Sequence, residues 1–214
     1  MNFPKHHTSK KMSAGKHIKY KCVIDDEDDD DMEKNDYSST IYTMGNKIYF
    51  YQDICAETIL HLKKEIYNLE KELTELKTKF NIEPIIELHL YSNGGDVFMG
   101  LDMYSHIKKS NIQIDTYVDG MIASAATFIF LAGTNRYIGE YGHILIHQLS
   151  TEFWGKYEDL KDEFNNSKAL MMNIKDLYQK NCSLPKNKLN EILKRELYLS
   201  SADCIKYQIS TEIL

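Results

Sequence analysis

The feature that most constrains the fold is a series of short apolar segments that alternate with helical ones between residues 84 and 148. The apolar segments are PIIELHLYS, IQIDTYVDG and RYIGEYGHILIHQ, and the segments between them are VFMGLDMYSHIKKS and the alanine-rich MIASAATFIFLAG. Buried strands that alternate with helices, with glycines at the joints, are typical of an α/β domain with a largely parallel sheet. A length of 214 residues fits one such domain with a tail.

The tail is predicted at residues 1–40, which divide by charge. The first 21 residues contain six lysines and no acid, and eight of the nine residues 25–33 are acidic. Because such a block repels itself, we expect a solvated, disordered tail rather than an acidic docking arm, and a folded domain over residues 41–214.

Composition excludes several classes of function. A net charge of -6 argues against a nucleic-acid partner. The longest apolar run, residues 121–133, is too short to span a membrane, and no apolar stretch of a secretory signal follows the basic residues. The four cysteines form no CxxC pair or Cys/His cluster, so we expect no metal, no cofactor and a reducing, cytoplasmic location.

Two long helices are predicted around these segments. Over residues 56–79 the apolar residues recur every three or four positions, which favours a helix packed on a sheet over a short coiled coil. Residues 156–180 read as a mostly exposed helix. Shorter elements are expected as a strand at 47–51 and helices at 186–195 and from Ser201. The apolar side of the 156–180 helix is assigned to Leu160, Phe164, Ala169, Met171 and Leu177.

Three motifs could carry chemistry. SNGGD, residues 92–96, follows a strand, and its paired glycines suit either an oxyanion hole or a tight turn without a ligand. Ser124 begins an apolar helix after a turn at Gly120. It suits either a nucleophile beside the Ala125 N–H or a plain helix cap. His147 ends an apolar strand and suits either a general base or a structural histidine. His143, nearby, competes for the role of the base.

In this order the motifs resemble the proteolytic subunit of the Clp protease, a family of serine peptidases, over residues 47–210. The family carries Ser-Pro-Gly-Gly, Ala-Ser-Met-Gly, Met-Ile-His-Gln-Pro and Arg-Asp-x-Phe-Leu-Ser-Ala. The corresponding segments here are LYSNGGD, DGMIASAA, LIHQ and KRELYLSSADC. The resemblance implies a crotonase-like α/β domain of repeated β-β-α units, with a mostly parallel sheet flanked by helices and a long protruding helix.

The resemblance also implies roles for five residues. Ser124 is similar to the nucleophile and His147 to the general base, while Gly95 and Ala125 match the positions of the oxyanion-hole donors. Glu196 stands where the family has its catalytic aspartate. Three further positions depart from the family pattern, namely Asn93 for the proline, Ala125-Ala126 for Met-Gly and Leu149 for the second proline.

By resemblance, the partners would be polypeptide substrates, further copies of the chain in stacked heptameric rings, and an ATP-driven AAA+ unfoldase. Two other functions stay open. Glu196 and the altered surroundings of Ser124 suit an inactive pseudo-subunit of a mixed ring. An acyl-CoA enzyme of the related crotonase type would instead use an acid such as Asp96 beside the glycine turn.

Overall fold

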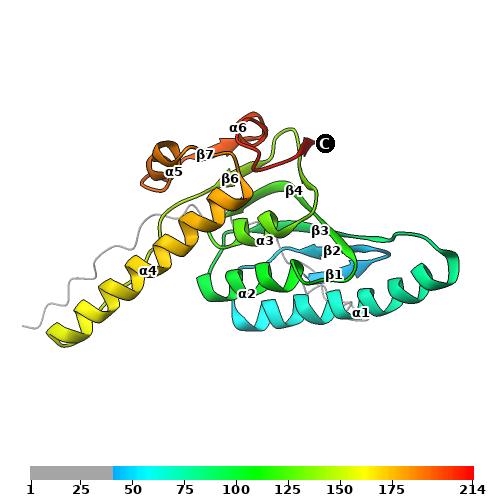
Figure 1. Cartoon of the computed structure of the whole chain (residues 1–214), viewed down its shortest axis with the longest axis horizontal. Helices are drawn as coiled ribbons and strands as arrows, with labels where there is room; N and C mark the ends of the chain where they lie inside the picture. Colours follow the sequence, from blue (N-terminus) through cyan, green and yellow to red (C-terminus); the bar gives the residue numbers. More distant parts are fainter. Residues whose placement is uncertain (1–40) are drawn as a thin grey trace, which may run out of the picture. The chain divides into compact units, whose positions relative to one another are not determined.

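A computed structural model describes residues 41–214, and the charged tail predicted at residues 1–40 lies outside the described residues. Strands and helices alternate through most of this region, as the sequence predicts (Figure 1). The elements are β1 Ile41–Met44, β2 Lys47–Phe50, α1 Ala56–Phe80, β3 Ile85–Ser92, α2 Val97–Ile107, β4 Gln113–Ala123, α3 Ala126–Ala132, β5 Arg136–Ile138, β6 His143–Leu145, α4 Tyr157–Asn181, α5 Lys186–Ile192, β7 Tyr198–Ser200, α6 Ser201–Lys206 and β8 Glu212–Ile213.

The strands form one mixed sheet in which parallel pairs predominate. The order is β1-β2-β3-β4-β5-β8, with β6 paired to β4 and β7 paired to β6, and among the described strands only the β1-β2 and β6-β7 pairs are antiparallel. Strand β4 acts as two strands, because its first part pairs with β5 and its last three residues pair with β6. The predicted α/β fold with a mostly parallel sheet is confirmed.

A bulge in β4 replaces the turn predicted at Gly120. Val118 pairs with Leu90 and Ile122 pairs with Ser92, so β4 has three residues where β3 has one. The prediction of a turn was wrong because the sheet continues through this bulge, where the strand changes partner. The bulge brings the end of β4 to β6, and therefore Ser124 to the segment that carries His147.

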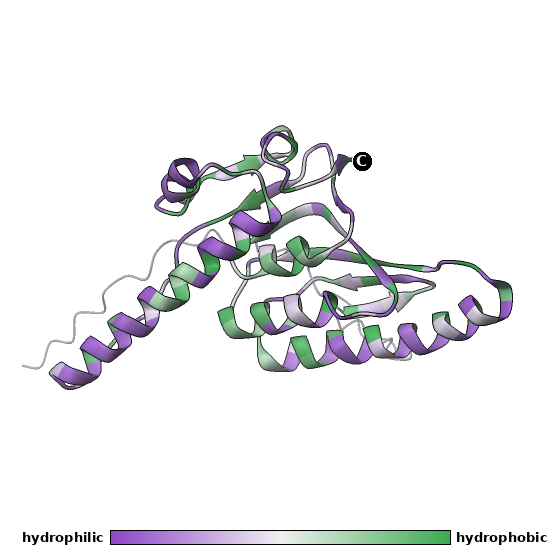
Figure 2. Cartoon of the chain, in the orientation of Figure 1, coloured by the Kyte–Doolittle hydropathy of each residue, from purple (hydrophilic) through white to green (hydrophobic). Residues whose placement is uncertain are grey.

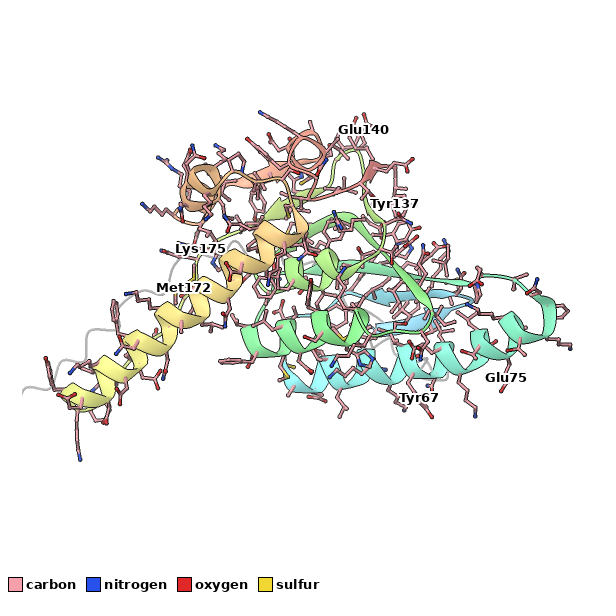
Figure 3. The ribbon with its side chains drawn as sticks, in the orientation of Figure 1. Tyr67, Glu75, Tyr137, Glu140, Met172 and Lys175 are labelled. Carbon is pink, nitrogen blue, oxygen red and sulfur yellow. The ribbon has the colours of Figure 1, made fainter. Side chains whose placement is uncertain are left out.

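Helices α1, α2 and α3 pack along one face of the sheet (Figure 1). The apolar stripe of α1 faces inward, while Tyr67 and Glu75 on its other side point to solvent (Figure 3). This confirms packing on the sheet rather than a coiled coil. Every residue of α3 is buried, which confirms the apolar run 121–133 as part of the core. The buried stripe of α1 consists of Ile59, Leu62, Ile66, Leu69 and Leu73.

Helix α4 is present as predicted, but its packed side lies further along the chain. The first turns are exposed and mainly hydrophilic (Figure 2), and the helix meets α3 only near its C-terminal end. The predicted apolar side was wrong at Leu160, Phe164 and Ala169, which are exposed. The buried residues are Ile174, Leu177 and Tyr178. Helix α5 ends at Ile192, three residues before the predicted end at 195.

The other face of the sheet carries a row of stacked rings, one from each of the strands β1 to β5. The centroids of neighbouring rings lie 4.6 to 4.8 Å apart. Tyr137, which ends the row on β5, is labelled in Figure 3. The row consists of Tyr42, Tyr49, His89, Tyr117 and Tyr137.

Candidate active site

Ser124 lies in the turn between β4 and α3 with a left-handed backbone, at a φ of 55°. This conformation typically costs a non-glycine residue about 1–3 kcal/mol, so the surrounding structure must hold it. The Ser124 N–H donates to the carbonyl of Leu145 at 2.9 Å, and the Ser124 carbonyl accepts from the N–H of Thr127 at 3.0 Å. Within residues 41–214 the Ser124 hydroxyl makes no hydrogen bond, so Ser124 is not a helix cap.

The glycine turn after β3 is fastened to a neighbouring segment and touches the Ser124 turn. Ile54 donates its N–H to the carbonyl of Gly94 at 2.7 Å and accepts from the N–H of Asp96 at 2.8 Å. A Cβ on Gly94 would lie 2.6 Å from the Cβ of Ser124, so only glycine allows this approach. Both glycines also have positive φ, which side chains disfavour.

Two main-chain donors border the Ser124 side chain. Among the described residues, neither the N–H of Gly95 nor that of Ala125 has a hydrogen-bond partner. Gly95 follows the glycine that contacts Ser124, and Ala125 is the next residue along the chain after Ser124. Two such N–H groups can stabilise an oxygen that becomes negatively charged during a reaction.

Asp96, the acid beside the glycine turn, is engaged in local structure. Its Oδ1 accepts hydrogen bonds from the N–H groups of Phe98 at 2.8 Å and Met99 at 3.0 Å. This is the bonding of a helix N-cap, and it accounts for an acid at this position without any substrate. The feature that kept the acyl-CoA hypothesis open therefore has a structural role.

His147 lies two residues beyond β6 and is half-buried. Its Nδ1 is 2.6 Å from the carbonyl oxygen of Gln148. Because a carbonyl can only accept, Nδ1 carries the proton, and Nε2 of the neutral ring is left as an acceptor. His143 is exposed and donates to the carbonyl of Tyr141 at 2.8 Å, so it is occupied elsewhere.

One pocket of about 170 Å³ brings the three motifs together. Within residues 41–214 no hydrogen bond joins Ser124 to His147, and catalytic hydrogen bonds are often long in the absence of substrate. Most of the other lining residues are apolar. The pocket is lined by Gly95, Val97, Ser124, Phe128, His147, Gln148, Leu149, Ser150, Ile174 and Tyr178.

Glu196 and His147 share a pocket next to the first one. The two residues line a second pocket of about 160 Å³, together with Lys194 and Arg195. Glu196 is exposed, and no hydrogen bond or ion pair connects it to His147 in the described part of the chain. Glu196 and His147 therefore line one pocket, but no interaction joins their side chains in the described part of the chain.

Two residues of the site were missed by sequence reasoning. Tyr178 lines the pocket, and Thr127 bonds to the Ser124 carbonyl through its hydroxyl at 2.6 Å. Tyr178 follows Ile174 by four positions, a spacing that puts both on one face of α4. That spacing could have been recognised, but no feature of the sequence indicates that this face meets Ser124.

Two of the three cysteines in the described region are poor competitors of Ser124 as nucleophiles. Burial raises the pKa of the Cys182 and Cys204 thiols to about 12, which disfavours the reactive thiolate. Cys55 is exposed at the N-cap of α1, where hydrogen bonding with Thr58 lowers the pKa of its thiol, but it does not line the pocket of Ser124. Cys22 lies outside the described residues. Among residues 41–214 no group of three or more His, Cys, Asp or Glu side chains is placed to hold a metal ion.

Comparison with known proteins shows the family of this chain. The family model described as Clp protease matches residues 38–214. The ATP-dependent Clp protease proteolytic subunit of Deinococcus radiodurans is 27% identical over 136 residues, which are 63% of this chain and 67% of the relative. The subunit of the same name from Borrelia garinii is 26% identical over 170 residues, covering 77% of this chain and 88% of the relative.

The fold has a counterpart among solved structures. A ClpP1 mutant from Listeria monocytogenes superposes with a TM-score of 0.67 at 21% identity, over 79% of this chain and 91% of that one. The α/β fold and the named relatives together indicate a protein of the ClpP-like peptidase class. Because the family model spans most of its length, the chain belongs to the Clp protease family.

Proposed function

We propose that the chain is a serine endopeptidase in which Ser124 is the nucleophile and His147 the general base. The observation that carries the proposal is the left-handed turn at Ser124, which opens into one pocket with His147. The N–H groups of Gly95 and Ala125, both without partners in the described chain, complete the set of groups that acyl transfer needs.

The first half of the reaction forms an acyl-enzyme. Nε2 of His147 takes the hydroxyl proton while Ser124 Oγ bonds to the carbonyl carbon of the peptide. The carbonyl oxygen becomes negative and is held by the N–H groups of Gly95 and Ala125, each worth on the order of 3 kcal/mol of transition-state stabilisation. The C–N bond then breaks, and the imidazolium returns its proton to the leaving amine.

In the second half, water hydrolyses the ester on Ser124. His147 takes a proton from the water as its oxygen attacks the acyl carbon, and the same two N–H groups hold the second oxyanion. The proton then returns to Ser124 Oγ as the ester bond breaks, which releases the carboxylic acid product.

Glu196 is the proposed third member of this set, with a role set by charge. The Gln148 carbonyl already fixes the proton on Nδ1 of His147. A carboxylate beside the ring would further stabilise the imidazolium that forms in each half-reaction. Both residues line the second pocket, which is consistent with this role.

The proposed working form is an assembly of stacked heptameric rings in the cytoplasm, fed with polypeptide by an AAA+ unfoldase. The names of the relatives support the role of a subunit and the dependence on ATP, since they describe the proteolytic subunit of an ATP-dependent protease. Large apolar side chains are exposed at the start of α4 and just before it, notably Trp154, Tyr157 and Phe164. Between residues 41 and 214 no helix is apolar and long enough to cross a membrane.

A peptide-cleavage assay tests the proposed chemistry. The purified chain should release fluorophore from a short peptidyl-coumarin substrate, and Ser124→Ala should reduce the rate to background. Ser105→Ala is a matched control, because Ser105 is exposed on α2 and bonds only to its own helix. Cleavage that survives Ser124→Ala would show that another residue is the nucleophile.

The isolated position of Glu196 favours a second candidate, an inactive pseudo-subunit that supports an active relative in a mixed ring. In that case the chain would assemble but cleave nothing alone, and adding it to an active subunit would change the mass of the assembly. Cleavage by a pure sample that depends on Ser124 would exclude this candidate.

A further inference from the structure

A buried pair of hydroxyl groups links helix α4 to the Ser124 turn. The Tyr178 hydroxyl oxygen lies 2.5 Å from Thr127 Oγ1, and Thr127 Oγ1 lies 2.6 Å from the carbonyl oxygen of Ser124. Tyr178 is 1% exposed and Thr127 0% exposed, so water does not compete for these bonds. The three groups form a short chain of hydrogen bonds behind the pocket.

The direction of this chain follows from counting hydrogens. A carbonyl oxygen can only accept, so the single hydroxyl hydrogen of Thr127 points to Ser124. Thr127 Oγ1 is then left as an acceptor, and the Tyr178 hydroxyl must donate to it. Each bond therefore orients the next, and the Tyr178 hydroxyl has a defined partner.

This series of hydrogen bonds ends on the peptide unit that also carries a proposed oxyanion donor. The Ser124 carbonyl and the Ala125 N–H belong to one planar peptide group, so they turn together. Hydrogen bonds from the N–H and hydroxyl of Thr127 hold the carbonyl at one end of that plane. They consequently fix the direction in which the Ala125 N–H points at the other end.

We propose that Tyr178 is a positioning residue, which acts through Thr127 to hold the Ser124–Ala125 peptide plane and so aims the Ala125 N–H at the oxyanion. The proposal rests on the proposed peptidase function. The Tyr178 ring lines the pocket beside Phe128, with the two ring centroids 6.0 Å apart. The proposal gives the Tyr178 hydroxyl a separate role.

The first test is Tyr178→Phe, which keeps the ring and removes only the hydroxyl. We expect kcat for a peptidyl-coumarin substrate to fall about tenfold with little change in KM, because the loss affects the transition state. Tyr104→Phe is the matched control. The Tyr104 hydroxyl also bonds to α4, at Asn181 with 3.2 Å, but has no connection to Ser124, so its kcat should stay within about twofold of wild type.

The second test asks whether Tyr178 acts through Thr127. If it does, Thr127→Val/Tyr178→Phe should have the kcat of Thr127→Val alone, because Thr127→Val already removes the hydrogen bonds that connect Tyr178 to Ser124. If the Tyr178 hydroxyl matters only for packing, the losses should multiply in the double variant. Multiplying losses, or an unchanged kcat in Tyr178→Phe, would overturn the proposal.

Hydrogen exchange separates failure of this proposal from failure of the proposed function. We expect amide exchange in residues 122–128 to become several-fold faster in Tyr178→Phe and to remain unchanged in Tyr104→Phe. This holds whether or not the protein cleaves peptides. An inactive wild type with this response would refute the peptidase function and retain the positioning role, whereas unchanged exchange in residues 122–128 would refute the positioning role.

Discussion

A Cβ on Gly95 would lie 2.2 Å from the carbonyl oxygen of Ile54, so a single methyl group is enough to disturb the proposed oxyanion site. Gly95 also has a φ of 142°, which L side chains rarely adopt. Gly95→Ala must therefore shift the glycine turn and its N–H. We expect kcat for peptide cleavage to fall by about 100-fold or more, as when one oxyanion donor is lost.

Gly45→Ala provides the control for backbone strain. Gly45 also has a positive φ of 60°, but a Cβ there would meet nothing within 4 Å, in the turn between β1 and β2. Its unfolding midpoint should fall slightly and its kcat should stay at the wild-type value. Equal kcat values for Gly95→Ala and the wild type would contradict the assignment of Gly95.

Glu196→Gln tests whether Glu196 acts on His147 through its charge alone. Because the Gln148 carbonyl fixes the tautomer, the substitution removes only the charge, and we expect kcat to fall about tenfold. A fall in kcat of about 10⁴-fold, as when the histidine of a catalytic triad adopts the wrong tautomer, would mean that Glu196 sets the position of the His147 proton in the active form. An unchanged kcat would remove Glu196 from the site.

The residues of the three motifs could be predicted from the sequence, but the residues that hold them in place could not. Ser124, His147 and Gly95 follow strands that pair in the sheet, and the structure brings them to one pocket; their catalytic roles stay predictions. Thr127 and Tyr178 are 51 positions apart, and their contact depends on where α4 crosses α3. No local pattern reports such a crossing.

Helix α4 shows what periodicity determines at the scale of an element. Its length could be predicted within one or two residues, because spacing and the proline after it mark its ends. Which turns are buried depends on the neighbouring elements, and only the last turns meet α3. The β4 bulge was unpredictable for a similar reason, since a glycine in a strand and a glycine in a turn look alike in sequence.

The pairing of β3 with β4 has a consequence for stability against pH. His89 Nδ1 lies 2.9 Å from Asp119 Oδ2, and this hydrogen bond, helped by the Tyr51 hydroxyl, lowers the pKa of Asp119 below 3.8. A lowered folded-state pKa means that Asp119 stabilises the fold above about pH 4 and loses this contribution as pH falls through the folded value.

Because the Asp119 side chain is 40% exposed and solvent screens its interactions, we expect Asp119→Ala to lower the free energy of unfolding by only about 0.5 kcal/mol at pH 7, and by less below pH 4. Urea unfolding at both pH values measures the difference. Asp176→Ala is the control, because Asp176 is exposed on α4 and has no polar partner among residues 41–214. A deficit for Asp119→Ala that grows as pH falls below 4 would contradict the sign of this shift.

Large apolar side chains are exposed on α4 and just before it, and they bear on how whole molecules associate. Phe164 on α4 is 63% exposed and Trp154 before the helix is 99% exposed in the single chain, and exposed apolar groups that cluster often mark interaction surfaces. Their burial between subunits would account for this exposure. We expect the native mass, measured by light scattering, to be far above the 25.0 kDa of one chain.

Phe164→Glu should reduce that mass by placing a charge where an apolar contact is expected. Asn166→Asp adds the same charge on an exposed polar position of α4 and should leave the mass unchanged. If the wild type is a monomer of 25.0 kDa, or if both variants keep the wild-type mass, α4 is not an assembly surface.

The central claim is that Ser124 is an activated nucleophile. Intact-mass spectrometry after treatment with a fluorophosphonate tests it most directly, with wild type and Ser124→Ala treated side by side in the assembled state. The prediction is one adduct per chain on the wild type, located at Ser124, and none on Ser124→Ala. An assembled wild type that acquires no adduct, or an adduct on both proteins, would contradict the claim.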